Sequence, residues 1–182
     1  MDYLDLTSTT QGSNTAGMFE EFYFARHEDV LTWPAIKAAP AVPADYVTYD
    51  TPFIMKTGKK FAKLNTILGN AEVKWSLVGA RGGKTFRNTL DVFMPENSAE
   101  KLGALSYMKN DKLVLIGRDR TKKLRVVGTE LLPAMLDTLD GTTGKKAEDD
   151  PGAGNTLLFV TEDDYPPIIY TDEIPLTPAV EE

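Results

Sequence analysis

A possible phosphate-binding loop is the first feature of the chain that could do chemistry. The tripeptide Gly83-Lys84-Thr85 has the residues that end a P-loop. Such a loop also needs a glycine five residues before Gly83, where this chain has Val78, and it must open a helix whose amide groups face the phosphates. Residues 85–93 instead alternate between apolar and polar side chains, which predicts a strand. The pattern therefore favours a hairpin turn over a nucleotide site.

His27 is the only histidine, and it stands next to two carboxylates in the sequence His27-Glu28-Asp29. No serine or cysteine nearby lies in the pattern of a nucleophile elbow, and one histidine without a second ligand makes a poor metal site. The sequence predicts a surface or strand-end histidine. We expect no catalytic, cofactor-binding or metal-binding residues, no cofactor, and a protein that is not an enzyme.

Two acidic runs, Glu148-Asp149-Asp150 and Glu162-Asp163-Asp164, offer oxygen ligands to a hard cation. Neither run has the spaced ligands and central glycine of a calcium loop. Both are therefore predicted to be solvated acidic loops.

Positive charge is confined to the middle of the chain. Residues 56–125 carry sixteen Lys/Arg and six Asp/Glu, whereas residues 1–55, 126–161 and 162–182 together carry four basic and twenty-one acidic residues. Charge segregated in this way favours contact between unlike regions, within one chain or between copies of it. Head-to-tail contacts of that kind build rings and stacked filaments.

The basic middle could also bind nucleic acid through its cations and the aromatic residues among them. The acidic pI of about 4.8 argues against this function, because nucleic-acid-binding domains are usually basic overall. We keep a small nucleic-acid-binding module as the alternative from a different class. The residues concerned are Lys56, Lys59, Lys60, Lys63, Arg118, Arg120, Lys122, Lys123 and Arg125, with Phe61, Trp75 and Phe86.

Composition sets further bounds on the protein. A chain of 182 residues can form one domain with extensions. It has no cysteine, which excludes disulfides and fits synthesis in a reducing cytoplasm. No apolar run approaches the roughly 18 residues of a membrane span, and residues 1–5 lack the pattern of a signal peptide. We expect no membrane partner.

The elements predicted from the sequence are mostly strands. Alternation of apolar and polar residues predicts strands over 60–68, 72–78 and 85–93. Aromatic residues predict a strand over 19–25, and a short charged turn predicts a hairpin of strands over 112–117 and 122–127. A last strand is expected over 156–161, with an extended segment at 168–170. One helix is expected over 98–109, with a capping box from Asn97 to Glu100 and an apolar stripe of Leu102, Leu105 and Met108. Glycines and mixed charges over 137–155 predict a long contact loop.

These elements predict a mainly β protein, a β-sandwich or partly closed barrel with one short α-helix, a long loop and extended termini. The expected organisation is a flexible N-terminal arm over 1–18, a single β-rich domain over 19–170, and an acidic C-terminal tail over 171–182.

The stretch from Glu72 to Val127 resembles the major tail tube proteins of tailed bacteriophages. It combines two strands around Gly79–Gly83, the helix Ser98–Lys109 and the hairpin Lys112–Val127, a layout that covers about a third of the chain. The likeness is in architecture and not in a diagnostic motif.

The resemblance implies a virion structural protein made in the host bacterial cytoplasm and located in the virion tail. It implies homo-oligomeric, hexameric rings that stack into a tube, contact other virion proteins, and let DNA pass without specific binding. Lumens in this family are typically negative, whereas alternation places Lys74, Lys84 and Arg87 on a solvent-side face. Capsid decoration and head–tail joining proteins are the alternatives within the structural class.

Overall fold

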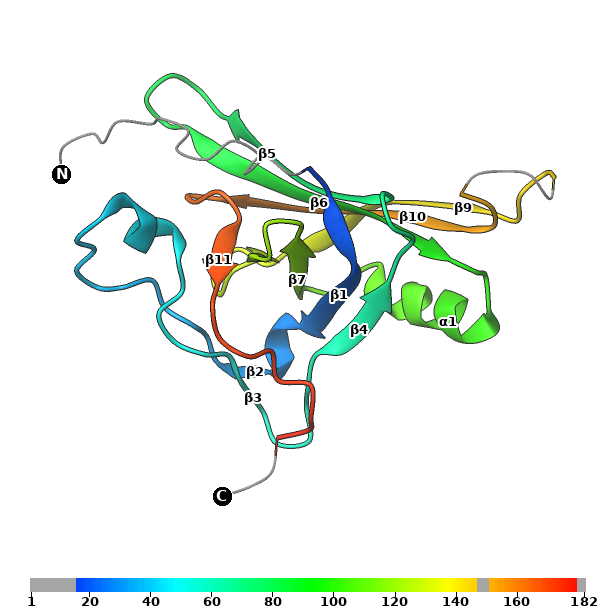
Figure 1. The fold of residues 1–182 in the computed structure, drawn as a ribbon, viewed down its shortest axis with the longest axis horizontal. Helices are drawn as coiled ribbons and strands as arrows, with labels where there is room; N and C mark the ends of the chain where they lie inside the picture. The colour runs from blue at the N-terminus through cyan, green and yellow to red at the C-terminus, as the bar shows by residue number, and fades with distance from the viewer. Residues whose placement is uncertain (1–15, 147–150, 180–182) are drawn as a thin grey trace.

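The computed structural model describes residues 16–146 and 151–179 (Figure 1). It contains two main sheets, a two-stranded sheet and one α-helix, so the predicted mainly β fold class is confirmed. The strands are β1 (Met18–Arg26), β2 (Val30–Thr32), β3 (Ile54–Met55), β4 (Ala62–Asn65), β5 (Ala71–Val78), β6 (Thr85–Pro95), β7 (Leu113–Asp119), β8 (Leu124–Val127), β9 (Met135–Thr142), β10 (Gly154–Asp163) and β11 (Ile168–Tyr170).

One sheet has five strands in the order β11-β8-β7-β1-β4, and the other has four strands in the order β5-β6-β10-β9. All pairings within the two main sheets are antiparallel. The predicted hairpins across Gly79–Gly83 and across Arg118–Thr121 are both present, as β5–β6 and β7–β8. Alternation in the sequence predicted β5 and β6, which have one face toward the core, whereas β7 and β8 are buried on both faces.

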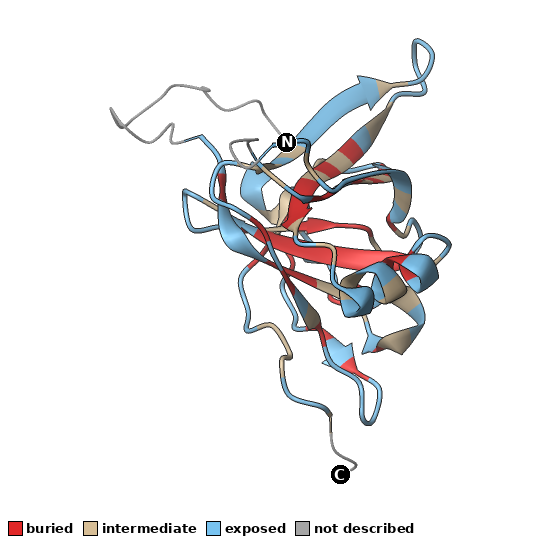
Figure 2. Cartoon of the chain, turned by 90° about the vertical axis from the view of Figure 1, so that its right-hand side faces the viewer, coloured by how far each residue is buried: buried red, intermediate tan, exposed pale blue. Residues whose placement is uncertain are grey.

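The main core lies between the two sheets, which pack as a sandwich (Figure 2). Phe22 comes from the five-stranded sheet, and Leu90 and Phe159 come from the four-stranded sheet; each is at most 1% exposed. The helix α1 (Ala99–Met108) contributes Leu105 and Met108 to this core. The predicted stripe residue Leu102 is exposed instead.

The N-cap of the helix lies one residue later than predicted. The Ser98 hydroxyl accepts a hydrogen bond from the Lys101 amide, so Ser98 and not Asn97 is the N-cap. Asn97 holds the β9–β10 pair instead: its side-chain amide donates to the Thr142 carbonyl, and its side-chain oxygen accepts from Asn155. The predicted capping box is therefore wrong, because Asn97 finds partners distant in sequence.

A second core covers the other face of the five-stranded sheet. It includes Tyr23, Ile116 and Val126 from the sheet, together with Phe53 and Phe61 from the long segment between β2 and β4. The five-stranded sheet is therefore buried on both faces, whereas the four-stranded sheet is covered on only one face.

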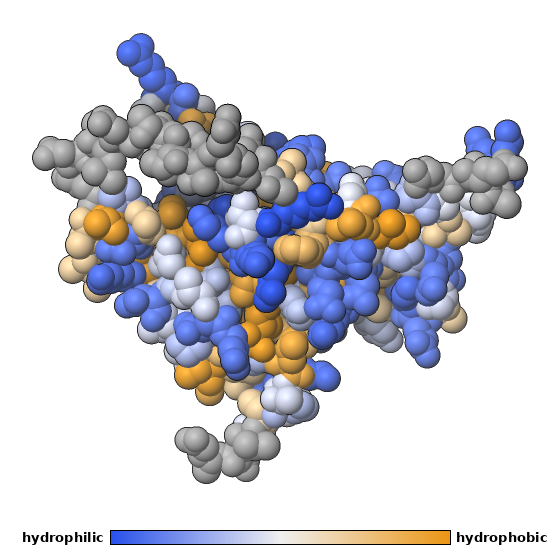
Figure 3. All heavy atoms as spheres, viewed as in Figure 1, coloured by the Kyte–Doolittle hydropathy of each residue, from blue (hydrophilic) through white to orange (hydrophobic). Residues whose placement is uncertain are grey.

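Residues 171–179, which we call the C-terminal strap, complete this second core. The Phe61 amide donates to the Pro175 carbonyl, and Ile174 and Leu176 pack against the core. On this side of the molecule, hydrophobic residues reach the surface in several separate places among hydrophilic ones (Figure 3). The expected tail over 171–182 thus lies on the domain as far as residue 179, and residues 180–182 lie outside the described residues.

Two further boundaries differ from the predictions. The predicted arm over 1–18 falls mostly outside the described residues, but Met18 is buried and begins β1. The predicted loop over 137–155 is wrong at both ends, because β9 extends to Thr142 and β10 begins at Gly154. Pairing with β10 makes a strand of a segment whose aspartates and glycine are unfavourable for one.

Candidate assembly surfaces

The glycine-rich segment at 79–84 is a hairpin turn. Thr85 opens the strand β6 and not a helix, so the P-loop motif has no helix N-terminus to offer a phosphate. Gly79 has a φ of 99°, and a Cβ atom there would lie 2.5 Å from the Gly83 carbonyl oxygen. The glycines serve the tight turn.

His27 directly follows β1, as a strand-end histidine was predicted to do. Its ring lies 4.8 Å from the Trp33 ring, and its Nε2 lies 2.6 Å from the Glu130 carbonyl oxygen. These contacts tie the loop before β9 to the end of β1.

The acidic run at 162–164 does not converge on one point. Glu162 is exposed and binds Arg87 at 2.6 Å, whereas Asp163 is buried and points to the other face of the sheet. The run at 148–150 lies outside the described residues. Within the described ranges, no group of three or more His, Asp or Glu side chains is placed to hold a metal ion.

Asp163 is a buried carboxylic acid at the end of β10. Burial raises the pKa of its carboxyl group, although hydrogen bonds from Thr129 and from the amides of Asp164 and Tyr165 act in the opposite direction. The same carboxylate and Glu130 add to the effect of burial on Tyr49, whose pKa is raised well above its usual range.

We predict that wild-type protein loses stability as the pH rises through the pKa of Asp163, and that the Asp163→Asn variant does not show this loss. Because the pKa of Asp163 is higher in the folded state, wild-type stability falls as the pH rises from the unfolded-state pKa, about 3.9, through the folded-state pKa. Urea unfolding at a series of pH values should show wild type losing stability relative to Asp163→Asn across that window. The exposed neighbour gives the matched control, Asp164→Asn. If the difference in unfolding free energy between wild type and Asp163→Asn stays constant with pH, the raised pKa of Asp163 is contradicted.

The basic residues of the middle region do not form one patch. Lys59 pairs with Asp29 and Lys63 with Glu21, near the β4 edge of the five-stranded sheet. Phe61 is 1% exposed and cannot stack on a base. The later cations lie on the β7–β8 hairpin, whose strands are two and three positions from β4 in the sheet.

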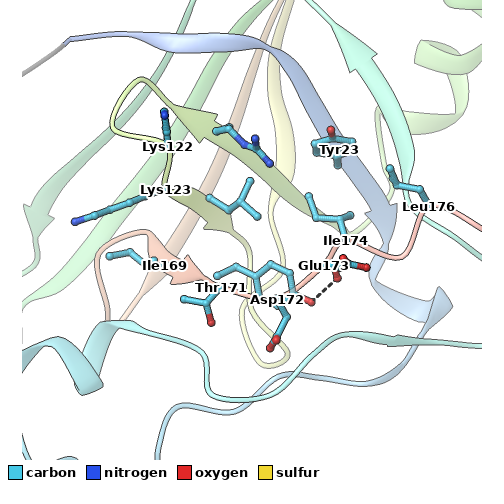
Figure 4. Close-up of a pocket in the computed structure, with 12 residues that line it drawn as sticks. Tyr23, Lys122, Lys123, Ile169, Thr171, Asp172, Glu173, Ile174 and Leu176 are labelled. Carbon is cyan, nitrogen blue, oxygen red and sulfur yellow. Dashed lines mark hydrogen bonds between the residues drawn. The ribbon is translucent and has the colours of Figure 1, made fainter.

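Four cations of the β7–β8 hairpin, Arg118, Arg120, Lys122 and Lys123, have no ion-pair partner among the described residues. A hollow of about 620 Å³ separates three of them from the C-terminal strap. Figure 4 shows Lys122 and Lys123 on one side of this hollow and Asp172 and Glu173 on the other. Its walls thus carry opposite charges without touching.

The base of the same hairpin is held rigidly. Asp119 accepts hydrogen bonds from the Thr121 hydroxyl, the Lys123 amide and Arg125. Burial by itself would raise the pKa of Asp119, but these donors lower it below its usual range. Arg125 also lies 6.0 Å from the ring of Trp75 on β5, so the two sheets meet at this end of the sandwich.

The uncovered face of the four-stranded sheet is polar, and we call it the outer face. Among the described residues, two ion pairs lie on this face. Lys74 binds Glu72 of the same strand at 2.8 Å, and Arg87 binds Glu162 of the neighbouring strand. The predicted solvent-side position of Lys74 and Arg87 is confirmed, whereas Lys84 is exposed in the turn before β6 and not on the face of the sheet. With Asp91 and Asp140, the outer face carries four acidic and two basic residues, a balance of −2.

The edge strands of the four-stranded sheet, β5 and β9, each pair with only one neighbouring strand within the described residues. The β5 edge continues into a tip that carries Arg81 and Lys84, and the β9 edge carries the exposed Asp137 and Asp140. None of these four side chains has an ion-pair partner among residues 16–146 and 151–179. A free strand edge is a template for pairing with another chain.

The β5–β6 hairpin extends beyond the core, as the exposed ribbon in Figure 2 shows. Its core-facing side chains Trp75 and Leu77 are 50% and 57% exposed, so the five-stranded sheet, whose Arg125 lies near the Trp75 ring, covers them only in part. Alternation in the sequence predicted their common face, but it could not show that this face overhangs.

Comparison with protein-family models, with curated proteins and with solved structures found no match to this chain. The function must therefore be argued from the surfaces themselves. In the described part of the chain, no helix is long and apolar enough to cross a bilayer.

Proposed function

We propose that this protein is a structural subunit that assembles with copies of itself by joining β5 of one copy to β9 of the next. The observation that supports this function is the four-stranded sheet, whose two free edges differ in charge. One edge presents Arg81 and Lys84 and the other presents Asp137 and Asp140. Unlike charges on opposite edges attract at long range and so favour head-to-tail association over pairing of like edges. They need not touch, because Asp137 and Asp140 lie level with the end of β5 that is distant from Arg81 and Lys84.

Strand direction also supports a repeated contact between β5 of one copy and β9 of the next, which we call the seam. The four strands alternate in direction, so β5 and β9 of one copy run in opposite directions. When copies are related by rotation about an axis roughly along the strands, β9 of the next copy meets β5 in antiparallel orientation. The seam then has the same hydrogen-bonding pattern as the interior of the sheet.

A closed ring formed in this way would have the outer face of the sheet on one side and the remainder of each sandwich on the other. Because the five-stranded sheet and its second core are the bulkier side, the outer face would line the bore. Its balance of −2 suits a channel through which DNA passes without specific binding.

Within this proposal, the best candidate is the tail tube subunit of a tailed phage. Stacked hexameric rings, a location in the virion tail, and contacts with other virion proteins follow from the architectural resemblance. Capsid decoration and head–tail joining proteins are the structural alternatives. The ring symmetry and the mass per ring would separate the three.

Light scattering and negative-stain imaging of purified protein test the self-assembly. We expect rings or tubes that grow with protein concentration and at low salt. A species that stays monomeric at high concentration and low salt would overturn the proposal.

The cations of the β7–β8 hairpin favour a second candidate, a nucleic-acid-binding module. If Arg118, Arg120, Lys122 and Lys123 each contact one phosphate of a single strand, the logarithm of affinity should fall with that of salt at a slope of roughly −3. A filter-binding titration at several salt concentrations measures this slope. Absence of binding at low salt excludes this candidate.

A further inference from the structure

The overhang of the β5–β6 hairpin leaves an apolar surface that one copy cannot bury. Trp75 and Leu77 point toward the core side of the sheet, yet about half of each side chain is in contact with solvent. The residue at the same level on β6, Asn88, is buried, so the exposure is confined to the edge strand. Large apolar side chains grouped at a sheet edge are typical of an interaction surface.

A second exposed apolar pair, Leu131 and Leu132, lies in the loop that precedes β9. Trp75 is paired with Asn88, and Asn88 is paired with Thr161. The Thr161 hydroxyl donates a hydrogen bond to the Leu132 carbonyl at 2.9 Å, so this loop passes the core side of the sheet next to Thr161. Its far end is bound to β7 through the backbone of Ala134 and Leu113. Leu131 is 87% exposed and Leu132 is 40% exposed.

From these positions we infer that Trp75 and Leu77 of one copy pack against Leu131 and Leu132 of the next copy. The inference rests on the proposed self-assembly and gives it a specific contact. Placing β9 of the second copy about 4.8 Å from β5 of the first brings the loop before that β9 toward the core side of β5, where Trp75 and Leu77 are exposed. The apolar surfaces that are exposed in one copy then cover each other.

Charge near the two apolar pairs agrees with this contact. Arg81 and Lys84 lie at the tip beyond Leu77, and Glu130 directly precedes Leu131. None of the three has an ion-pair partner within the described ranges. Opposite charges next to an apolar contact favour one alignment of the two edges over others.

Engineered cysteines test the contact directly, because the chain has no cysteine of its own. Leu77→Cys and Leu131→Cys are mixed, treated with a short thiol cross-linker, and analysed on a denaturing gel. We expect a covalent dimer from the mixture and none from either variant alone, because the contact joins unlike positions. Mixing Leu77→Cys with Tyr107→Cys is the control, since Tyr107 is 72% exposed on α1.

The double variant Leu77→Cys/Leu131→Cys extends the test. Head-to-tail contact should give a ladder of covalent oligomers whose largest member contains as many copies as a closed ring. Rings or tubes of wild-type protein without any link between positions 77 and 131 would overturn the contact and leave self-assembly standing. A wild-type protein that remains monomeric would overturn both.

Discussion

Replacing Leu77 with glutamate should prevent assembly while leaving the single copy folded. Leu77 is 57% exposed in one copy, so the free energy of unfolding should change by no more than about 0.5 kcal/mol. In the joined edges the new carboxylate would lose its water without gaining a partner, at a cost of a few kcal/mol. A cost of about 3 kcal/mol weakens each contact more than about 100-fold.

Concentration-dependent light scattering measures the association of this variant, and thermal unfolding followed by circular dichroism checks its fold. Tyr107→Glu, which introduces the same charge on the helix, should assemble as wild type does. Assembly of Leu77→Glu at the wild-type concentration would show that the overhang lies outside the contact between copies.

The largest loss of stability is expected for Phe159→Ala. Phe159 is 0% exposed on β10, where it packs between the two sheets in the main core. Removing its ring leaves a cavity that the surrounding strands can fill only in part. We expect the free energy of unfolding to fall by about 3–5 kcal/mol in urea titrations.

Leu131→Ala is the matched control for this substitution, because it removes an apolar side chain of which only a small part is buried. Its effect on the single copy should stay within about 0.5 kcal/mol. A Phe159→Ala variant as stable as Leu131→Ala would mean that the sandwich core is not packed as described.

Local patterns in the sequence predicted strands with one regular apolar face, such as β5 and β6, and strands that are apolar on both faces, such as β7. Alternation of Val73, Trp75 and Leu77 with Lys74 and Ser76 predicted β5 and its two faces, and the structure confirms them. The same pattern failed for β9, because a solvent-exposed edge strand needs no regular apolar face. What makes residues 135–142 a strand is pairing with β10, which local sequence does not reveal.

The candidate contact depends even more on distant parts of the chain. Strand pairing and one hydrogen bond link Trp75, Asn88, Thr161 and Leu132, which no spacing in the sequence brings together. The strap was missed for a related reason: Ile174 and Leu176 stand among prolines and acids, and only the second core gives them a surface to cover. Charge segregation was readable from the sequence, but the edges that carry the charges were not.

The number of strands in the four-stranded sheet determines which channel widths a ring of this protein could have. Each copy adds four strands to a closed ring, or roughly 19 Å of circumference at the usual strand spacing. Enlarging the ring by one copy would therefore widen the barrel by roughly 6 Å, with no intermediate size. In such a ring every contact between β5 and β9 would have the same hydrogen bonds, so these bonds would not determine the number of copies. The twist and curvature of the sheet would then determine the diameter.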